Sequence, residues 1–295
     1  MEKKKQRLLN LVRRVHGLVD NSDIDRQRQS QEQIGTFLGN TKEISYQEFE
    51  MEGIFAEWIA VDRPHMKKYI ILYCHGGGYS TGSTKYARTI TSKLAASTSM
   101  DVLAFDYRLA PEHPYPAALQ DAMKIWNYLM LLGYGARDII VAGDSAGGNL
   151  ALALVLKLKE EQRLLPRGLV LLSPWTDLTC SGMSFHQKSK EDPILNPEYL
   201  YQIRENYVKG QDFTSPYISP LFGDLQELPP TYIQVGENEI LYSDATRLHQ
   251  RLVEANVSAH IDTFEGMWHV FQMVPFKTAY EAMNKCAEFI FDICR

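Results

Sequence analysis

The chain has 295 residues, of which 45% are hydrophobic and 23% are charged, so it can bury an ordinary core without disulfides or metal ions. The formal net charge of −5 is mild and gives no reason to expect a nucleic-acid partner. No run of about 18 apolar residues occurs, so we expect no helix that spans a membrane.

The cysteines and the N-terminus indicate the compartment. Cys74, Cys180, Cys286 and Cys294 form no CxxC pair and have no metal-ligand spacing, which is typical of a reducing compartment. Polar residues interrupt the first apolar run too early for a secretory signal. We therefore expect a cytoplasmic protein without stable membrane insertion, metal or cofactor.

The N-terminal part of the chain is predicted to be helical. Apolar residues recur at helical spacing over residues 8–19, a turn cluster covers residues 20–23, and a polar helix extends to about Leu38. Residues 44–51 and 54–61 then alternate between apolar and polar around Glu52-Gly53, which predicts a β-hairpin.

Beyond residue 68, short apolar runs alternate with longer helical segments. Such runs are typical of parallel strands that are covered by helices on both faces, so we predict an α/β fold with about eight strands, the hairpin included. The runs are 69–73, 102–105, 139–142, 169–172, 232–235 and 260–264, and the helical segments include 87–97, 117–132, 148–161, 244–255 and 279–294.

One connection does not fit this alternation. Residues from about 178 to 218 lie between two sheet strands, are polar and aromatic, and contain three prolines. Since a connection of this length is usually functional, we interpret it as part of a cap.

The sequence Gly143-Asp144-Ser145-Ala146-Gly147 lies between a predicted strand and a predicted helix. In that context G-x-S-x-G is the nucleophile elbow, whose tight turn needs small neighbours and lifts the serine oxygen clear of the sheet. We therefore predict that Ser145 is a catalytic nucleophile.

A second glycine-rich loop, His75-Gly76-Gly77-Gly78-Tyr79, directly follows another strand. Its backbone N–H groups are suited to an oxyanion hole, where donors lie about 3 Å from the developing negative charge. A phosphate loop would need a G-x-x-x-x-G-K-[ST] pattern, which this segment lacks.

A serine nucleophile of this type is followed in the chain by an acid and then a histidine. Of the histidines after Ser145, His269 comes directly after the last strand, whereas His260 begins that strand and His249 lies within a helix. Loops after strand C-termini are where α/β sites assemble, so we predict His269 as the base.

The acid is left open by this reasoning. The loop after strand 232–235 contains Glu237, Glu239 and Asp244. Asp244 is interpreted as the N-cap of the next helix. Spacing does not choose between the two glutamates.

The chain resembles the hormone-sensitive-lipase-like family (family IV) of α/β-hydrolases, particularly its bacterial carboxylesterases. The resemblance runs from about residue 65 to the end. Besides the two loops above, it is carried by Asp106-Tyr107-Arg108-Leu109-Ala110-Pro111-Glu112, Ser173-Pro174-Trp175 and Glu265-Gly266-Met267-Trp268-His269-Val270-Phe271.

The resemblance implies a single domain, residues 1–295, with an eight-stranded, mostly parallel sheet and a helical cap formed by about 1–40 and about 178–218. It selects Glu239 as the acid, although the usual residue there is Asp, and Val270 stands where the family commonly has Gly. It also assigns the oxyanion hole to the amides of Gly77, Gly78 and Ala146.

The resemblance further implies hydrolysis of short-chain carboxylic esters, which a serine nucleophile would carry out through an acyl-enzyme intermediate. Tyr79, Trp175 and Phe271 are candidates for the substrate pocket, although aromatic side chains beside a core are often simply core. We interpret His75, Asp144 and the segment 106–112 as structural, with Arg108 pairing with a carboxylate.

Other readings stay open at this point. An amidase, a carbohydrate deacetylase or a long-chain lipase would use the same residues. A ligand-binding receptor on the same fold would lack the catalytic histidine, which is present here as His269. The N-terminal helix and the last strand are both candidates for a homodimer contact.

Overall fold

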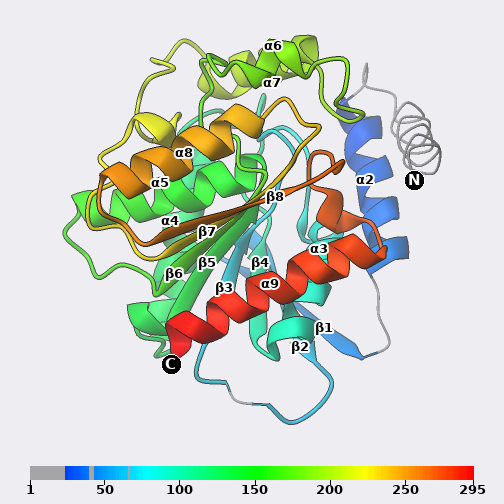
Figure 1. Cartoon of the computed structure of the whole chain (residues 1–295). Coiled ribbons are helices and arrows are strands. Elements are labelled where there is room, and N and C mark those ends of the chain that lie inside the picture. The colour runs from blue at the N-terminus through cyan, green and yellow to red at the C-terminus, as the bar shows by residue number, and fades with distance from the viewer. Residues whose placement is uncertain (1–23, 40–42, 66) are drawn as a thin grey trace.

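The computed structural model describes residues 24–39, 43–65 and 67–295, which form a central sheet covered by helices (Figure 1). The helix and turn expected over residues 8–23 lie outside the described residues. Each predicted strand and each later predicted helix is present, with ends shifted by three residues or fewer. The strands are β1 (Ile44–Met51), β2 (Ile54–Val61), β3 (Ile70–Cys74), β4 (Asp101–Phe105), β5 (Ile139–Asp144), β6 (Gly168–Leu172), β7 (Thr231–Gly236) and β8 (Ala259–Phe264).

The eight strands form one sheet in the order β1-β2-β4-β3-β5-β6-β7-β8. The hairpin β1–β2 joins β4 antiparallel, and every later pairing is parallel. The carboxyl ends of the parallel strands therefore meet at one edge, where the two glycine loops and the histidine loop emerge. Strand β8 forms the end of the sheet, and its role as a dimer contact stays a prediction.

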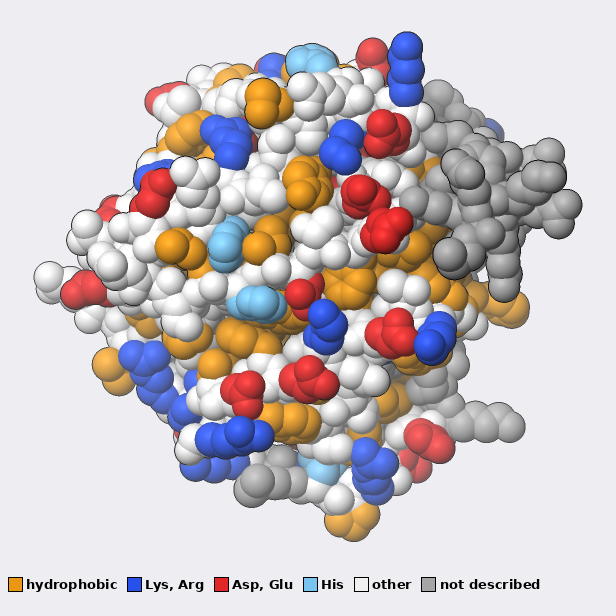
Figure 2. All heavy atoms as spheres, viewed as in Figure 1, with side chains coloured by type: hydrophobic (Ala, Val, Ile, Leu, Met, Phe, Trp, Pro, Cys, Tyr) orange, Lys and Arg blue, Asp and Glu red, His pale blue; other side chains and the backbone are white. Residues whose placement is uncertain are grey.

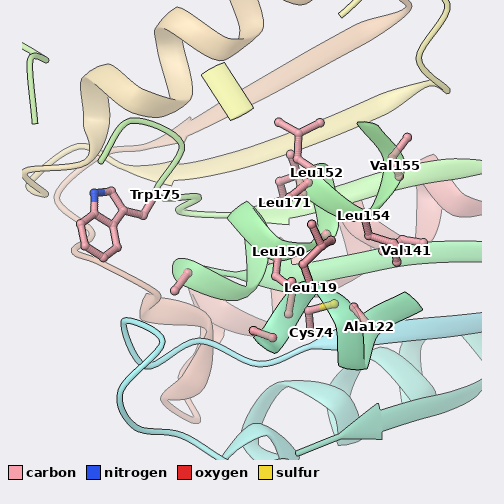
Figure 3. Packing of buried hydrophobic residues seen from close by; sticks show 14 of the residues in the cluster. Cys74, Leu119, Ala122, Val141, Leu150, Leu152, Leu154, Val155, Leu171 and Trp175 are labelled. Atoms are coloured by element: carbon pink, nitrogen blue, oxygen red, sulfur yellow. The ribbon is translucent and has the colours of Figure 1, made fainter. Parts of the chain in front are cut away.

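Helices cover both faces of the sheet (Figure 1). The helices are α2 (Ile24–Gly39), α3 (Thr84–Thr98), α4 (Ala117–Leu131), α5 (Ala146–Glu160), α6 (Ser184–Gln187), α7 (Pro197–Val208), α8 (Tyr242–Glu254) and α9 (Lys277–Cys294), with short 3₁₀ turns at Ala136–Asp138, Pro220–Phe222 and Phe271–Met273. Because side chains alternate along a strand, Leu72 of β3 packs on one face with α4, α5 and α8, while Ile71 packs on the other face with α3 and α9. Figure 3 shows Cys74, Leu119 and Leu150 within the first of these clusters.

The long connection between β6 and β7 carries α6 and α7, which lie above the carboxyl edge of the sheet (Figure 1). Helix α7 begins with Asn196 as N-cap, whose side chain accepts a hydrogen bond from the amide of Tyr199. Gln27 of α2 donates to the hydroxyl of Tyr199 at 2.9 Å. The described part of the N-terminal region therefore contacts the long connection directly.

The prediction that Asp244 caps α8 is wrong. The N-cap position is Leu241, and Asp244 lies in the first turn of the helix. Its buried carboxylate instead accepts hydrogen bonds from the amides of Thr176 and Asp177 at 2.9 and 2.8 Å. Asp244 thus anchors the start of the long connection to α8, a contact between distant segments that local spacing cannot reveal.

The surface does not gather charge of one sign on the face shown in Figure 2, where Lys and Arg side chains are interspersed with Asp and Glu. No helix within the described ranges is long and apolar enough to cross a membrane.

A buried ion pair joins the hairpin to the helix layer and provides a test of the fold. Glu57 of β2 is fully buried, and Arg88 of α3 donates to it through Nε at 2.9 Å and also through Nη2. Arg88→Met leaves the Glu57 carboxylate buried without this partner, so we expect a loss of about 3–5 kcal/mol in the free energy of unfolding, measured by urea titration. The double variant Glu57→Leu/Arg88→Met should recover most of that loss, and a double variant as unstable as Arg88→Met contradicts the interpretation.

Candidate active site

Ser145 lies at a sharp turn between β5 and α5, with φ 53° and ψ −121°. Backbone hydrogen bonds hold the turn: the Ser145 amide donates to Leu172 and its carbonyl accepts from Trp175, at 2.9 and 3.0 Å. A Cβ at Gly147 would stand 2.1 Å from the carbonyl oxygen of Cys74. Glycine is required there because β3 approaches the first turn of α5 so closely.

The structure brings Ser145, His269 and Glu239 into one hydrogen-bonded chain. Nε2 of His269 lies 2.9 Å from Oγ of Ser145, and Nδ1 lies 2.7 Å from Oε2 of Glu239. All three residues are buried. If Nδ1 carries the proton, which the acceptor Glu239 favours, Nε2 is free to accept the proton of the serine hydroxyl.

Glu239 is fixed on its other oxygen. Oε1 accepts hydrogen bonds from the hydroxyl of Ser173 at 2.9 Å and from the amide of Gly236 at 2.5 Å. Its neighbour Glu237 has a different task, because its Oε2 accepts from the amide of Gly266 at 2.9 Å. Of the acids that spacing left open, Glu239, which the family resemblance selected, is therefore the one that contacts His269.

The loops that carry the acid and the base are joined to each other. The amide of Glu237 donates to the carbonyl of Phe264, and the amide of Asn238 donates to the carbonyl of Met267, at 3.0 and 2.8 Å. Val270 has φ 48°, in the left-handed region that β-branched residues rarely adopt. This backbone conformation explains why glycine suits the position, and the amide of Val270 is held there by the hydroxyl of Ser173 at 3.2 Å.

Opposing effects act on the pKa of His269. Burial lowers this pKa, but the hydrogen bond and the charge of Glu239, with added charge from Asp192 and Asp144, raise it above the ordinary value. The imidazolium is thus the form that the surrounding carboxylates stabilise.

The glycine loop after β3 lies beside the elbow because Cys74 pairs with Gly143 in the sheet. Oδ1 of Asp144 accepts from the Tyr73 hydroxyl at 2.6 Å and from the Gly76 amide at 2.9 Å, so the elbow anchors the loop. Three backbone amides near this junction, those of Gly77, Gly78 and Ala146, donate no hydrogen bond to any residue that the structure describes.

The residues interpreted as structural pack around this loop. His75 stacks on Tyr107 with ring centroids 4.1 Å apart, and its carbonyl accepts from the Tyr107 hydroxyl at 2.8 Å. Burial lowers the pKa of His75 to about 4, so its ring is neutral near pH 7. Arg108 pairs with Asp121 at 2.8 Å, as expected.

The three pocket candidates are buried in the present conformation. Tyr79 stacks face to face on Tyr207 of α7, with ring centroids 3.7 Å apart. Trp175 and Phe271 have no accessible surface, and Phe271 packs against Phe264. Their role in binding substrate stays a prediction.

Sequence reasoning did not assign roles to two residues that touch this network. Ser173 bridges Glu239 and Val270, and its place in the Ser173-Pro174-Trp175 motif was the available signal. Asp192, from the long connection, accepts from the amide of Ile240 at 2.9 Å, and no motif pointed to it.

Known proteins resemble the chain in sequence and in fold. Residues 71–273 match the family model described as alpha/beta hydrolase fold. An esterase of Acinetobacter venetianus is 41% identical over 223 residues, 75% of this chain and 74% of that one, and an acetyl-hydrolase of Streptomyces hygroscopicus is 37% identical over 216 residues, 73% and 72%.

A crystal structure of an esterase from the bacterial hormone-sensitive lipase family superposes with a TM-score of 0.91 at 33% identity, covering 98% of this chain and 97% of that one. The likeness thus extends over the sheet, the helices and the long connection. The chain belongs to the α/β-hydrolases, in their bacterial hormone-sensitive-lipase family, and is a carboxylic-ester hydrolase.

Proposed function

We propose that the chain is a serine carboxylesterase for short-chain esters, with Ser145 as nucleophile, His269 as base and Glu239 as the orienting acid. The observation that carries this proposal is the continuous chain of hydrogen bonds from Ser145 Oγ through both ring nitrogens of His269 to Glu239. These three residues lie at the carboxyl edge of the parallel strands, which is the edge where ligands bind in such sheets.

In the proposed reaction, Ser145 Oγ attacks the ester carbonyl carbon while its proton passes to Nε2 of His269. The tetrahedral oxyanion accepts hydrogen bonds from the amides of Gly77, Gly78 and Ala146, each donor contributing roughly 3 kcal/mol. When the intermediate collapses, the C–O bond to the alcohol breaks and His269 returns the proton to the departing alkoxide. Water then attacks the acyl-enzyme by the same proton transfers and releases the acid.

Glu239 stays ionised throughout in this mechanism. It holds the imidazole in the tautomer that leaves Nε2 unprotonated, and it stabilises the imidazolium that forms. The bonds from Ser173 and Gly236 to Oε1 keep Oε2 directed at Nδ1. A glutamate can therefore take the place of the usual aspartate, because the two hydrogen bonds to Oε1 hold its longer side chain in place.

The preference for short acyl chains is proposed from the cap, which we assign to α2 and the segment 178–218. Cδ1 of Ile203 in α7 lies 2.2 Å from where a Cβ of Gly78 would stand, so the cap closes directly over the glycine loop. Space beside the reacting carbonyl is thereby restricted. The relative from Streptomyces hygroscopicus, named an acetyl-hydrolase, agrees with a small acyl group.

We also propose a cytoplasmic location from the cysteines. All four are free thiols, and three of them are buried. Burial raises the pKa of the Cys180 thiol to about 12, which keeps it protonated and unreactive.

Ser145→Ala should abolish hydrolysis, with kcat lowered by several orders of magnitude, because no nucleophile remains. The measurement is release of p-nitrophenol from esters ranging from acetate to palmitate. The wild type should be most active on the shortest esters. Full activity in the variant contradicts the nucleophile assignment, and an inactive wild type favours an amide, a sugar ester or a receptor role.

Glu239→Gln should lower kcat by about 10⁴-fold, because the amide can direct the imidazole into the wrong tautomer. Glu237→Gln is the matched control two residues away, since a glutamine oxygen can still accept from Gly266. That variant should retain most of the activity. The reverse order of the two effects contradicts the choice of acid.

The pH dependence of kcat/KM should follow His269, which must be neutral to accept the serine proton. Because Glu239 raises the pKa of His269, kcat/KM should fall on acidification through a midpoint above the ordinary value of 6.5. In Glu239→Gln the midpoint should move to lower pH. A wild-type profile that stays flat down to pH 5 is inconsistent with this base.

A further inference from the structure

Three polar side chains of the long connection reach the loop that carries Glu239. They are Ser184, Lys188 and Asp192, four residues apart in sequence. Such spacing places side chains on one side of a helical or turn-rich segment, and α6 and the turns after it supply that geometry. The segment Ser184–Asp192, called the clasp below, therefore presents all three to the same loop.

The loop between β7 and α8, residues 237–241, carries Glu239 and is called the acid loop below. The first two contacts of the clasp fix its backbone on both sides of Glu239. Lys188 Nζ donates to the carbonyl of Glu237. Ser184 Oγ donates to the carbonyl of Ile240 at 2.7 Å and accepts from the amide of Ser243 at 2.8 Å. The loop thus depends on the long connection for several of its backbone hydrogen bonds.

Asp192 makes the contact nearest the acid. Its Oδ2 accepts from the amide of Ile240 at 2.9 Å, and that amide belongs to the peptide bond formed by the carbonyl of Glu239. Its Oδ1 accepts from the amides of Ile194 and Leu195 at 2.8 and 3.0 Å. A single buried carboxylate therefore ties a turn of the cap to the peptide that follows Glu239.

The charge of Asp192 also acts on the base. Within the described residues Asp192 forms no ion pair with Lys or Arg, and Lys188 of the same segment donates to the Glu237 carbonyl instead. Burial raises the pKa of Asp192 to about 6, while the charge of His269 opposes that rise. The other charged groups acting on His269 are Glu239 and Asp144. The charge of Asp192 thus raises the pKa of His269, in the same direction as the charges of Glu239 and Asp144.

We infer that Asp192 is a positioning residue for the ester hydrolysis, because its carboxylate holds the loop that carries Glu239 from the cap. The inference rests on the proposed function, because it acts through Glu239 and His269. It assigns the clasp a role in catalysis in addition to covering the site.

The test compares Asp192→Asn with Asp106→Asn on p-nitrophenyl acetate. Asp106 is a matched control: it is a partly buried carboxylate that accepts a hydrogen bond from a backbone amide, that of Thr84 at 2.6 Å, and burial raises its pKa also to about 6. It contacts neither the acid loop nor His269. Unchanged far-ultraviolet circular dichroism and melting temperature serve as the check that both variants fold.

Asp192→Asn should lower kcat on the order of ten- to a hundredfold, with a smaller change in KM, because the acid and base lose their alignment. The midpoint of the acid limb of kcat/KM should move to lower pH, since a negative charge near His269 is removed. Asp106→Asn should change neither. Equal kcat and equal midpoints in the two variants overturn the inference.

Ser184→Ala tests the clasp if Asp192→Asn does not fold. It removes one hydrogen bond to the acid loop and one to the first turn of α8 without changing any charge, so kcat should fall while the acid-limb midpoint stays in place. Wild-type kcat in a folded Ser184→Ala variant counts against the clasp. Ser145→Ala separates the two proposals: an active Ser145→Ala variant contradicts the proposed function, whereas an inactive one beside a fully active Asp192→Asn variant contradicts only the inference.

Discussion

The pairing of β3 with β5 is the constraint on which the site depends. It sets Cys74 opposite Gly143, so the two strands end together and their loops must share one small volume. The space is so limited that a side chain at Gly147 would collide with the backbone of Cys74 and His75. The same closeness lets Asp144 accept a hydrogen bond from the amide of Gly76, while the next two amides of the glycine loop donate no hydrogen bond within the described residues. The proposed nucleophile and the proposed oxyanion donors are thus brought together by one strand register.

Much of this arrangement could be predicted from the sequence because its determinants are local. Buried parallel strands are short apolar runs, and the elbow needs small residues at fixed offsets, so both are visible in the order of residues. The placement of His269 at the carboxyl edge of the sheet could be predicted because the last strand ends just before it, whereas its role as base stays a proposal. The ends of the helices differed from expectation by a few residues, since the first turns contain polar residues such as Thr84 and Lys277 that periodicity does not detect.

What could not be predicted depends on contacts between distant segments. Periodicity and spacing did not separate Glu237 from Glu239, because the difference lies in which of them faces His269 and which faces Gly266. Asp244 has the composition of an N-cap, yet it binds the amides of Thr176 and Asp177. Asp192 belongs to no recognised motif, and its partner Ile240 is 48 residues away in the chain. Such roles follow from the fold and not from the local pattern.

The carboxylates near His269 share a physical feature that bears on catalysis. Glu239, Asp144 and Asp192 are each stabilised by amide or hydroxyl donors and not by Lys or Arg within the described ranges. Neutral donors stabilise a buried carboxylate without cancelling its field at a distance as a cation would. The three charges therefore all raise the pKa of His269, whose imidazole gains a positive charge in the proposed mechanism as the tetrahedral intermediate forms. Interactions that strengthen only as a reaction proceeds lower its barrier. Burying three carboxylates without cations is costly for the resting fold, but in the proposed mechanism their charges favour the transition state.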